Sequence, residues 1–281
     1  MKNLAFIILF LLISCKENNV EKPKSTKNLN KTVRIQPEVD IKELESNFMK
    51  WWNYYSDNIL LTSNFKSFDE NLDTIYKEEF LKKLITGNFI PLKIESQDKL
   101  NIYKLHKLDS SASKSILNTI KNESSKSLKL FKMEGESFPD FQFKDIKGNN
   151  YNEKNIAGKT IILKTWFINC TACITEFPEL NELVDKHKNN KDFVFLSLAT
   201  DSKDKLEFFL EKKEFKYAVV SNQKEFIENN LDLNAYPTHI IINSKGVIEK
   251  VTNKASVMIS FLKNENEKKE VKNFRTPPPP M

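Results

Sequence analysis

One pair of cysteines constrains this chain more than any other feature. Cys170 and Cys173 follow the apolar run 160–168 directly and precede a helix-like stretch. β-Branched and aromatic residues dominate that run, which is typical of a buried strand. Two thiols three residues apart at a helix start can close a small reversible disulfide, and helix amides stabilise a thiolate at the first of them. The pattern predicts a dithiol redox centre at a strand-to-helix junction.

Other uses of the pair are less consistent with the sequence. A structural disulfide across three residues closes too small a loop to restrict the unfolded chain much. A zinc site needs four ligands. The chain has only one other cysteine, Cys15, and it lies far from the pair in the sequence. We therefore expect no metal site and no cofactor.

Composition excludes further classes of function. Five glycines and three histidines make a glycine-rich phosphate cradle or a histidine-rich metal centre improbable. The net charge of +6 comes from 44 basic and 38 acidic residues that are interleaved along the chain. No basic block with interleaved aromatic residues occurs, so we expect no nucleic-acid partner.

The N-terminal segment predicts export. Lys2 precedes an apolar stretch, residues 4–13, that is too short to span a bilayer but suits a signal-peptide core. Residues 12–15 resemble the lipobox of bacterial lipoproteins, which implies cleavage after residues 1–14 and lipidation of Cys15. The alternative is an ordinary secretory signal with an incidental cysteine. Either form places the chain where disulfides can form, and the lipobox implies a lipid anchor on a bacterial membrane, facing the periplasm. Inner and outer membrane both remain open.

Residues 15–37 have little apolar content and are expected to form a flexible tether. Residues 38–133 are expected to form a helix-rich N-terminal domain of unknown role. Apolar residues recur at three- and four-residue steps there, which predicts helices. The helices are expected at 41–59, 67–85 with a capped start at 67–70, and 115–131, and two short strands at 88–95 and 100–106. The aromatic residues of this domain could line a recognition groove but are more typical of a core.

Residues 134–269 alternate between strand and helix patterns, which predicts a central mixed sheet covered by helices. One strand is expected to end at the cysteines, and further strands are expected at 193–199, 217–220, 239–242 and 247–251. The helices are expected at 170–188, 203–213, 224–230 and 255–269. Residues 270–281 include four consecutive prolines and predict an extended tail.

This second domain resembles a thioredoxin-fold domain of the TlpA/ResA-like thiol–disulfide oxidoreductases, an exported and often membrane-anchored bacterial group. Four ordered motifs carry the resemblance, and they lie at residues 138–141, 157–159, 170–178 and 236–238. The resemblance implies an α/β, thioredoxin-like fold preceded by the helix-rich domain.

The resemblance also implies roles for the thiols. Cys170 would be the attacking thiolate, and Cys173 would resolve the mixed disulfide and close a Cys170–Cys173 disulfide. Glu176 matches an acidic residue of the family thought to assist proton movement at the thiols, although a glutamate on a helix surface is also common. Pro178 matches a proline that kinks the active-site helix.

A second motif implies a substrate platform. Pro237 would be the cis-proline that faces the disulfide in this fold, with a trans proline opening a strand as the alternative. The backbone of Tyr236 would then be exposed so that a substrate peptide can pair with it as an added strand, and Thr238 would complete this substrate-binding segment.

Three positions depart from the family pattern. Asn169 stands where most relatives have tryptophan, and Ala172 stands where many have proline. Lys164 stands where relatives often have a buried aspartate or asparagine. Lys164 and Trp166 are therefore candidates for redox tuning. An inward-pointing lysine would favour thiolates and make the couple more oxidising, whereas a lysine that reaches solvent would not.

The pattern as a whole predicts an enzyme that reduces protein disulfides in the cell envelope. Its partners would be a disulfide-bearing protein substrate and an upstream thiol electron donor. A binding module with a vestigial redox centre is an alternative from another class. A thiol peroxidase is less consistent with the sequence, because peroxidases of this fold place threonine three residues before the attacking cysteine, where Phe167 stands.

Overall fold

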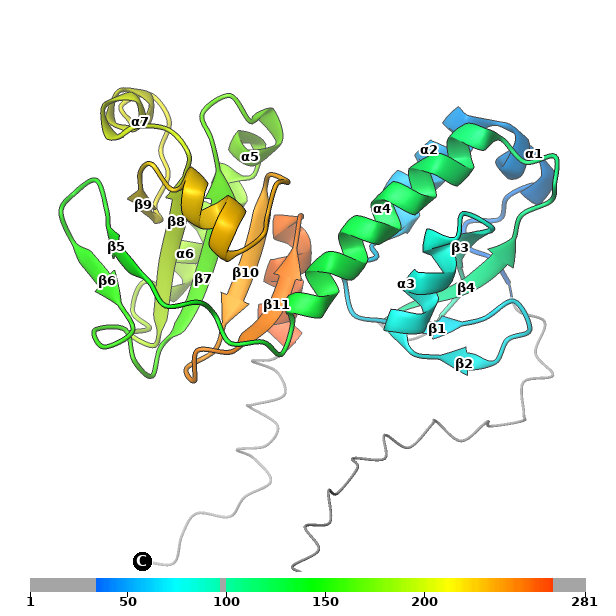
Figure 1. Ribbon diagram of the computed structural model, residues 1–281, viewed down its shortest axis with the longest axis horizontal. Coiled ribbons are helices and arrows are strands. Elements are labelled where there is room, and N and C mark those ends of the chain that lie inside the picture. The colour runs from blue at the N-terminus through cyan, green and yellow to red at the C-terminus, as the bar shows by residue number, and fades with distance from the viewer. Residues whose placement is uncertain (1–33, 97–99, 265–281) are drawn as a thin grey trace, which may run out of the picture.

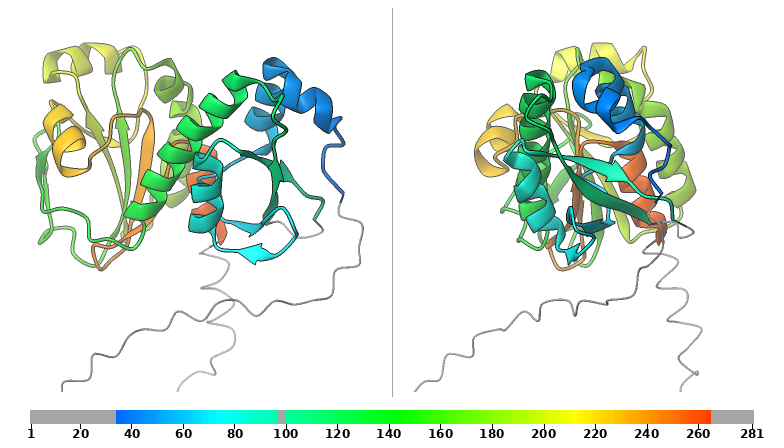
Figure 2. Two further views of the ribbon diagram at one scale, coloured as in Figure 1. Left: turned by 45° about the vertical axis from the view of Figure 1, so that its right-hand side comes forward. Right: turned by 90° about the vertical axis from the view of Figure 1, so that its right-hand side faces the viewer.

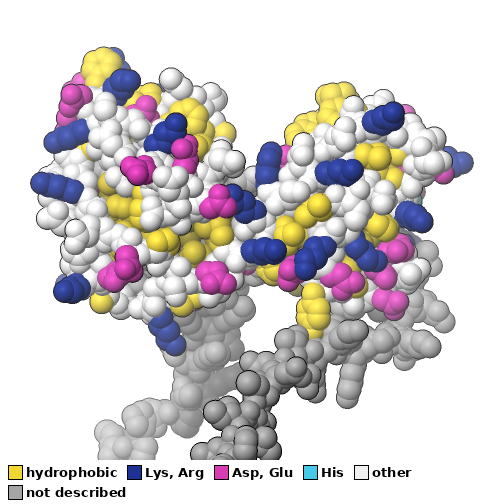
Figure 3. All heavy atoms as spheres, viewed as in Figure 1, with side chains coloured by type: hydrophobic (Ala, Val, Ile, Leu, Met, Phe, Trp, Pro, Cys, Tyr) yellow, Lys and Arg dark blue, Asp and Glu magenta, His cyan; other side chains and the backbone are white. Residues whose placement is uncertain are grey.

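The chain folds into two α/β lobes that lie side by side (Figure 1). The computed structural model describes residues 34–96 and 100–264. We call residues 34–133 the N-terminal lobe and residues 134–264 the C-terminal lobe. The expected signal peptide, Cys15 and the proline-rich tail lie outside the described residues. On the face shown in Figure 3, basic and acidic side chains are interspersed over both lobes.

The N-terminal lobe combines four helices with a four-stranded sheet. The helices are α1 (Ile41–Ser46), α2 (Phe48–Asn58), α3 (Lys77–Ile85) and α4 (Lys114–Met133). The strands, in the order in which they pair, are β2 (Thr74–Ile75), β1 (Phe65–Phe68), β4 (Asn101–Lys107) and β3 (Phe89–Lys93). Trp51, Phe80 and Tyr103 are fully buried, so these aromatic residues form a core between the helices and the sheet.

The sheet makes the N-terminal lobe less helical than expected. The helix start expected at 67–70 was wrong: Ser67 lies in β1, where its hydroxyl donates a hydrogen bond to the carbonyl of Ile75 at 2.8 Å. Pairing of β1 with the parallel strand β4 overrides the local capping pattern. The helix that follows begins only at Lys77, after β2.

The C-terminal lobe has the expected architecture, a mixed sheet flanked by helices. Its five strands, in pairing order, are β11 (Ile248–Thr252), β10 (Thr238–Ile242), β7 (Thr160–Trp166), β8 (Phe193–Ala199) and β9 (Ala218–Val220). β7, β8 and β9 are parallel, whereas β10 runs antiparallel to both neighbours. The other elements are the hairpin β5 (Gln142–Lys144) and β6 (Asn150–Asn152), the helices α5 (Thr171–Thr175), α6 (Phe177–His187) and α7 (Lys203–Leu210), the π-helical turn η1 (Phe226–Asn230), and a C-terminal helix described over 255–264.

The helix expected at 170–188 is divided in two. α5 ends and α6 begins at Glu176, and Pro178 lies in the first turn of α6. Proline has no amide hydrogen to donate and is tolerated in a first turn, where no partner is required. At this break, the Glu176 side chain contacts Lys164 and His239 on the strands of the sheet.

Alternation along the strands decides which side chains lie under α5 and α6. Leu163 and Ile240 point to one face of the sheet, where they join a core with the hairpin and η1. Their neighbours Lys164 and His239 point to the opposite face, and they are direct partners across the β7–β10 pair. The sheet thus places a lysine and a histidine side by side beneath the active-site helices.

Both edges of this sheet are covered by backbone from the same lobe. Along β11, the amide of Gly135 donates to Ile248 at 2.8 Å, and the amide of Ile248 donates to Glu136 at 2.9 Å. Along β9, the amide of Ile146 donates to Val219 at 2.8 Å. The edge strands therefore have part of their hydrogen-bonding capacity filled.

Helix α4 connects the lobes and lies against β11, as Figure 2 shows. Two polar contacts join the lobes there, between Thr62 and Thr252 and between Asn64 and Lys250, which also pairs with Glu134 of its own lobe. The hydroxyls of Thr62 and Thr252 are 2.8 Å apart, and Lys250 Nζ is 2.8 Å from Glu134 Oε1 and 3.3 Å from Asn64 Oδ1. Within residues 34–96 and 100–264, no helix has the length and apolar content to cross a membrane.

Candidate active site

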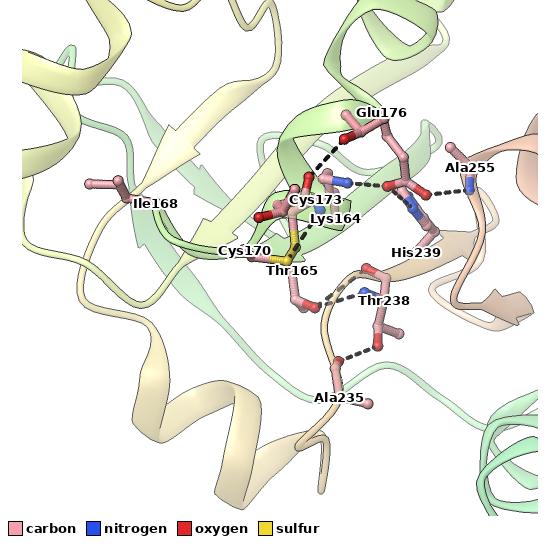
Figure 4. The surroundings of a disulfide bond; sticks show 12 residues. Lys164, Thr165, Ile168, Cys170, Cys173, Glu176, Ala235, Thr238, His239 and Ala255 are labelled. Carbon is pink, nitrogen blue, oxygen red and sulfur yellow. Dashed lines mark hydrogen bonds and ion pairs between the residues drawn. A yellow bond between two sulfur atoms is a disulfide. The ribbon is translucent and has the colours of Figure 1, made fainter. Parts of the chain in front are cut away.

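The two cysteines form a disulfide at the start of α5 (Figure 4). The Cys170 and Cys173 sulfurs are bonded at 2.02 Å, and the Cys173 amide donates to Cys170 Sγ at 3.2 Å. Cys170 is 8% exposed and Cys173 is fully buried. A disulfide substrate approaching from solvent therefore reaches Cys170 first, which fits the order expected for attacking and resolving thiols.

The loop before α5 is held by hydrogen bonds. The amide of Ile168 donates to Asp201 Oδ2 at 2.8 Å, and the amide of Cys170 donates to the carbonyl of Phe167 at 3.1 Å. Asp201 lies after β8, so the loop is anchored to the neighbouring parallel strand. These contacts fix the approach to the outer sulfur.

Trp166 is buried directly beneath the thiols. Its indole Nε1 donates to Ser197 Oγ at 3.2 Å, and its ring meets Phe177 edge to face at 5.1 Å. Trp166 belongs to the same apolar cluster as the two cysteines. Its ring therefore packs against the buried side of the disulfide region and makes that environment apolar.

The segment 236–238 lies beside the disulfide. The Tyr236–Pro237 bond is cis, the isomer that the family resemblance implies. The Thr238 amide donates to Thr165 Oγ1 at 3.2 Å, and the Tyr236 ring packs edge to face on Phe167 at 5.3 Å. The backbone of Tyr236 makes no hydrogen bond to any described residue of the chain.

Glu176 is the centre of a buried polar cluster on the other side of the disulfide (Figure 4). Its Oε2 lies 2.5 Å from Lys164 Nζ and 2.9 Å from His239 Nε2. Its Oε1 accepts a hydrogen bond from the amide of Ala255, the first residue of the C-terminal helix, at 2.9 Å. Lys164 and His239 are both fully buried. We call Lys164, Glu176 and His239 the Glu176 cluster.

The cluster fixes the charge of each member. Burial would raise the pKa of Glu176, but the hydrogen bond from His239 and the charge of Lys164 outweigh it and lower the pKa to about 2. Burial lowers the pKa of His239, and the hydrogen bond to Glu176 offsets this only in part. At neutral pH the imidazole is uncharged and donates its Nε2 proton to a carboxylate. The positive charge of His239 contributes to Glu176 only in acid.

Lys164 is an inward-pointing lysine, so the solvent-reaching alternative is excluded. Burial lowers the pKa of Lys164, and the carboxylate of Glu176 opposes that change. The amine is directed at Glu176, and both oxygens of Glu176 are occupied by donors. This geometry favours a fixed anion at Glu176 over a freely available proton acceptor.

His239 is the site residue that the sequence did not reveal. In the sequence it is only the start of an apolar strand, directly after the segment 236–238. Its position opposite Lys164 depends on the register between β7 and β10, which lie far apart in the chain. A buried lysine at position 164 was itself the available signal, because such a charge requires a partner.

Two other expectations concern groups beyond this cluster. Cys15, the expected lipidation site, lies outside the described residues. Within the two described stretches, no group of three histidine, cysteine, aspartate or glutamate side chains could hold a metal ion. The cysteine pair and the Glu176 cluster therefore form the candidate site.

Comparison with known proteins identifies similar chains. The model of the AhpC/TSA family matches residues 135–251. The thiol-disulfide oxidoreductase ResA of Geobacillus kaustophilus is 25% identical over 117 residues, which cover 42% of this chain and 67% of that protein. The thioredoxin-like protein YneN of Bacillus subtilis is 25% identical over 120 residues, covering 42% and 70%. A solved thiol-disulfide oxidoreductase from Bacteroides fragilis aligns with 20% identity and a TM-score of 0.42, covering 46% of this chain and 98% of that one.

Proposed function

The chain is a thioredoxin-fold thiol–disulfide oxidoreductase of the TlpA/ResA-like family, and from this premise we propose that it reduces disulfides of other proteins in the cell envelope. The observation that carries the proposal is the Cys170–Cys173 disulfide, in which Cys170 is 8% exposed and Cys173 is fully buried. A small reversible disulfide of this form stores two electrons when it is reduced.

The proposed reaction has two exchange steps. The Cys170 thiolate attacks one sulfur of a substrate disulfide, which forms a mixed disulfide and releases the first substrate thiolate. Cys173 then loses its proton and attacks Cys170 Sγ, which releases the second substrate thiolate and closes the Cys170–Cys173 disulfide. Two electrons pass from the enzyme to the substrate, and an upstream thiol donor returns them.

The segment 236–238 is the proposed substrate platform. The unpaired backbone of Tyr236 lies next to the disulfide, and its ring and that of Phe167 form an apolar wall. An extended substrate peptide can therefore pair with Tyr236 while its cysteine reaches Cys170. Thr238 supports the platform, because its amide and hydroxyl are bonded to Thr165 and to the carbonyl of Ala235.

The cell envelope is the proposed location. The sequence of residues 1–15 supports export, and lipidation of Cys15 would hold the enzyme at a membrane surface. An oxidising compartment supplies disulfide-bearing substrates. A Cys15→Ser variant should lose label from a fatty-acid analogue in bacteria and move from the membrane to the soluble fraction, with its redox chemistry unchanged in vitro. A labelled C15S protein would contradict lipidation at this position.

Single-turnover reduction tests the reaction itself. The reduced full chain should reduce the disulfides of insulin and become oxidised in equal amount, as measured by thiol trapping. Cys170→Ser should abolish the reaction, whereas Cys173→Ser should accumulate a mixed disulfide through Cys170 that is visible by mass spectrometry. A wild-type chain that never exchanges with any disulfide would contradict the proposal. Consumption of hydroperoxide at a rate above that of insulin reduction would favour the peroxidase alternative.

A further inference from the structure

Lys164 and His239 have no role in the exchange steps above, yet both are buried against Glu176. We propose that they are positioning residues that hold Glu176 as an anion beside the thiols, so that Lys164 and Glu176 together set the reduction potential of the disulfide as one compensated pair. The inference rests on the proposed redox function and adds to it the residues that tune the couple.

The geometry joins four elements at one carboxylate. Lys164 comes from β7 and His239 from β10, and both bond Glu176 Oε2. Oε1 bonds the amide that begins the C-terminal helix at Ala255. Glu176 itself lies at the junction of α5 and α6. A carboxylate bonded in this way has little freedom to rotate toward the thiols or away from them.

The cluster is close enough to the thiols to act on them. Cys173 lies in α5, and Glu176 caps the end of that helix three residues later, with the cluster beside the disulfide in Figure 4. Lys164 lies two residues before Trp166 on β7, and Trp166 packs in one apolar cluster with both cysteines. Lys164 Nζ lies 2.5 Å from that carboxylate. Both charges are shielded from solvent, and buried charges are screened little by salt.

The two charges act on the thiols in opposite directions. A lysine cation near the pair stabilises thiolates, which favours the reduced form and makes the couple more oxidising. A glutamate anion destabilises thiolates and makes the couple more reducing. Paired as they are, the two effects largely cancel, so the potential depends on keeping both charges.

Reduction potentials of single and double variants test this compensation. In Lys164→Met, His239 and the Ala255 amide still donate to Glu176 and keep it an anion, so the equilibrium constant with glutathione should shift about tenfold toward the disulfide, about 30 mV more reducing. In Glu176→Gln the cation remains, and the shift should have the opposite sign. The double variant K164M/E176Q should return close to the wild-type potential. Because burial lowers the pKa of Lys164, the measurements are made at several decreasing pH values, since lower pH favours the protonated amine.

Lys250→Met is the matched control. Lys250 is also a fully buried lysine on a strand of the same sheet, and it pairs with Glu134 at 2.8 Å, but this pair lies at the contact between the lobes. K250M should alter stability and leave the potential unchanged. A shift in K250M equal to that in K164M would show that loss of any buried lysine perturbs the couple, and the inference would be wrong.

The role of His239 has its own readout. Isotope-edited NMR titration of the Glu176 carboxyl should give a pKa near 2 in the wild type and a higher value in His239→Phe. Glutamine can place an amide nitrogen near the position of Nε2, so His239→Gln should keep the pKa low. Equal pKa values in all three proteins would leave His239 without a positioning role.

Different results would contradict the compensated pair and the proposed function. If the wild type cycles between dithiol and disulfide but K164M and E176Q shift the potential in the same direction or not at all, the compensated pair is wrong and the enzyme remains. If the wild type does not cycle with glutathione or dithiothreitol, the proposed function itself is wrong.

Discussion

Glu176 Oε2 receives two donors from two different strands, and this sharing controls the chemistry at the scale of single residues. A buried carboxylate without donors would take up a proton at ordinary pH. Lys164 and His239 prevent this, so the site keeps a fixed negative charge at the end of α5, three residues after Cys173. The cost is that each member of the cluster depends on the others.

Acid should destabilise the fold through this cluster. The pKa of Glu176 is about 2 in the folded chain and near 4.5 when unfolded, so its contribution is complete above pH 4.5 and is lost as the pH falls toward 2. The pKa of His239 lies below its ordinary 6.5, so the unfolded chain binds its proton first and stability also falls below pH 6.5. Urea unfolding across this range measures both effects. His239→Gln should flatten the part that begins at pH 6.5, and an unchanged profile would contradict the assignment.

The loop before Cys170 offers a second prediction at this scale. Asp201→Ala removes the acceptor for the Ile168 amide and should lower the free energy of unfolding by about 1 kcal/mol. Asp201→Asn keeps an oxygen acceptor and is the control, with a smaller loss expected in urea titrations. If the two variants lose equal stability, the hydrogen bond is not the cause.

Single residues differ in how far the sequence could predict them. The cysteine pair and the proline at 237 were predictable because each belongs to a local motif with its own chemistry. The orientation of Lys164 was left open, and His239 was missed, because both depend on which strands become neighbours. That information lies in the packing of the whole sheet.

At the scale of elements, the strand–helix alternation of the C-terminal lobe was predictable because apolar runs and turn residues mark each strand. β8 matches its expected range, 193–199. β1 and β2 were not predictable, since β1 has only four residues and pairs in parallel with β4, which is distant in sequence. A serine followed by acidic residues imitates a helix start when that partner is unknown.

The end of α3 carries a prediction for an element. Gly87 follows the helix with φ +76° and donates its amide to Leu84 at 2.9 Å, a conformation that L-residues with a side chain rarely adopt. Gly87→Ala should lower the free energy of unfolding by about 1 kcal/mol or more, because a Cβ would also lie 2.3 Å from Lys121 Cε. Gly135→Ala is the matched control, since Gly135 has φ +95° and open space around its Cβ position. Chemical denaturation should show a smaller loss for G135A, and the reverse order would contradict the steric part.

At the scale of the whole molecule, a buried threonine pair and a partly buried lysine contact join the lobes. Thr62 and Thr252 share one hydrogen bond, and Lys250 bridges Glu134 and Asn64. The division of the chain near residue 134 was an inference from composition. The docking was not predictable, because threonines and a lysine in sequence are typical of a solvated surface.

A double-mutant cycle tests this contact. Thr252→Val leaves the Thr62 hydroxyl buried without its partner and should lower the free energy of unfolding by about 1–2 kcal/mol. The double variant T62V/T252V removes both hydroxyls and should recover part of that loss. Thermal and urea unfolding of the full chain provide the energies. Strictly additive losses would mean that the two threonines do not interact across the lobes.

The partly covered sheet edges affect how this protein associates with other copies of itself at high concentration. Backbone from residues 135–136 and 146 already occupies positions along β11 and β9 that a strand from another chain would use. When such chains are crowded together, a strand of a neighbouring chain finds fewer free backbone groups along β11 and β9, which disfavours edge-to-edge association there. The unpaired backbone of Tyr236 lies next to the disulfide. An extended peptide that pairs with this backbone is therefore placed where disulfide exchange can occur. The fold thus favours pairing with a substrate peptide beside the disulfide over pairing along the edges of the sheet.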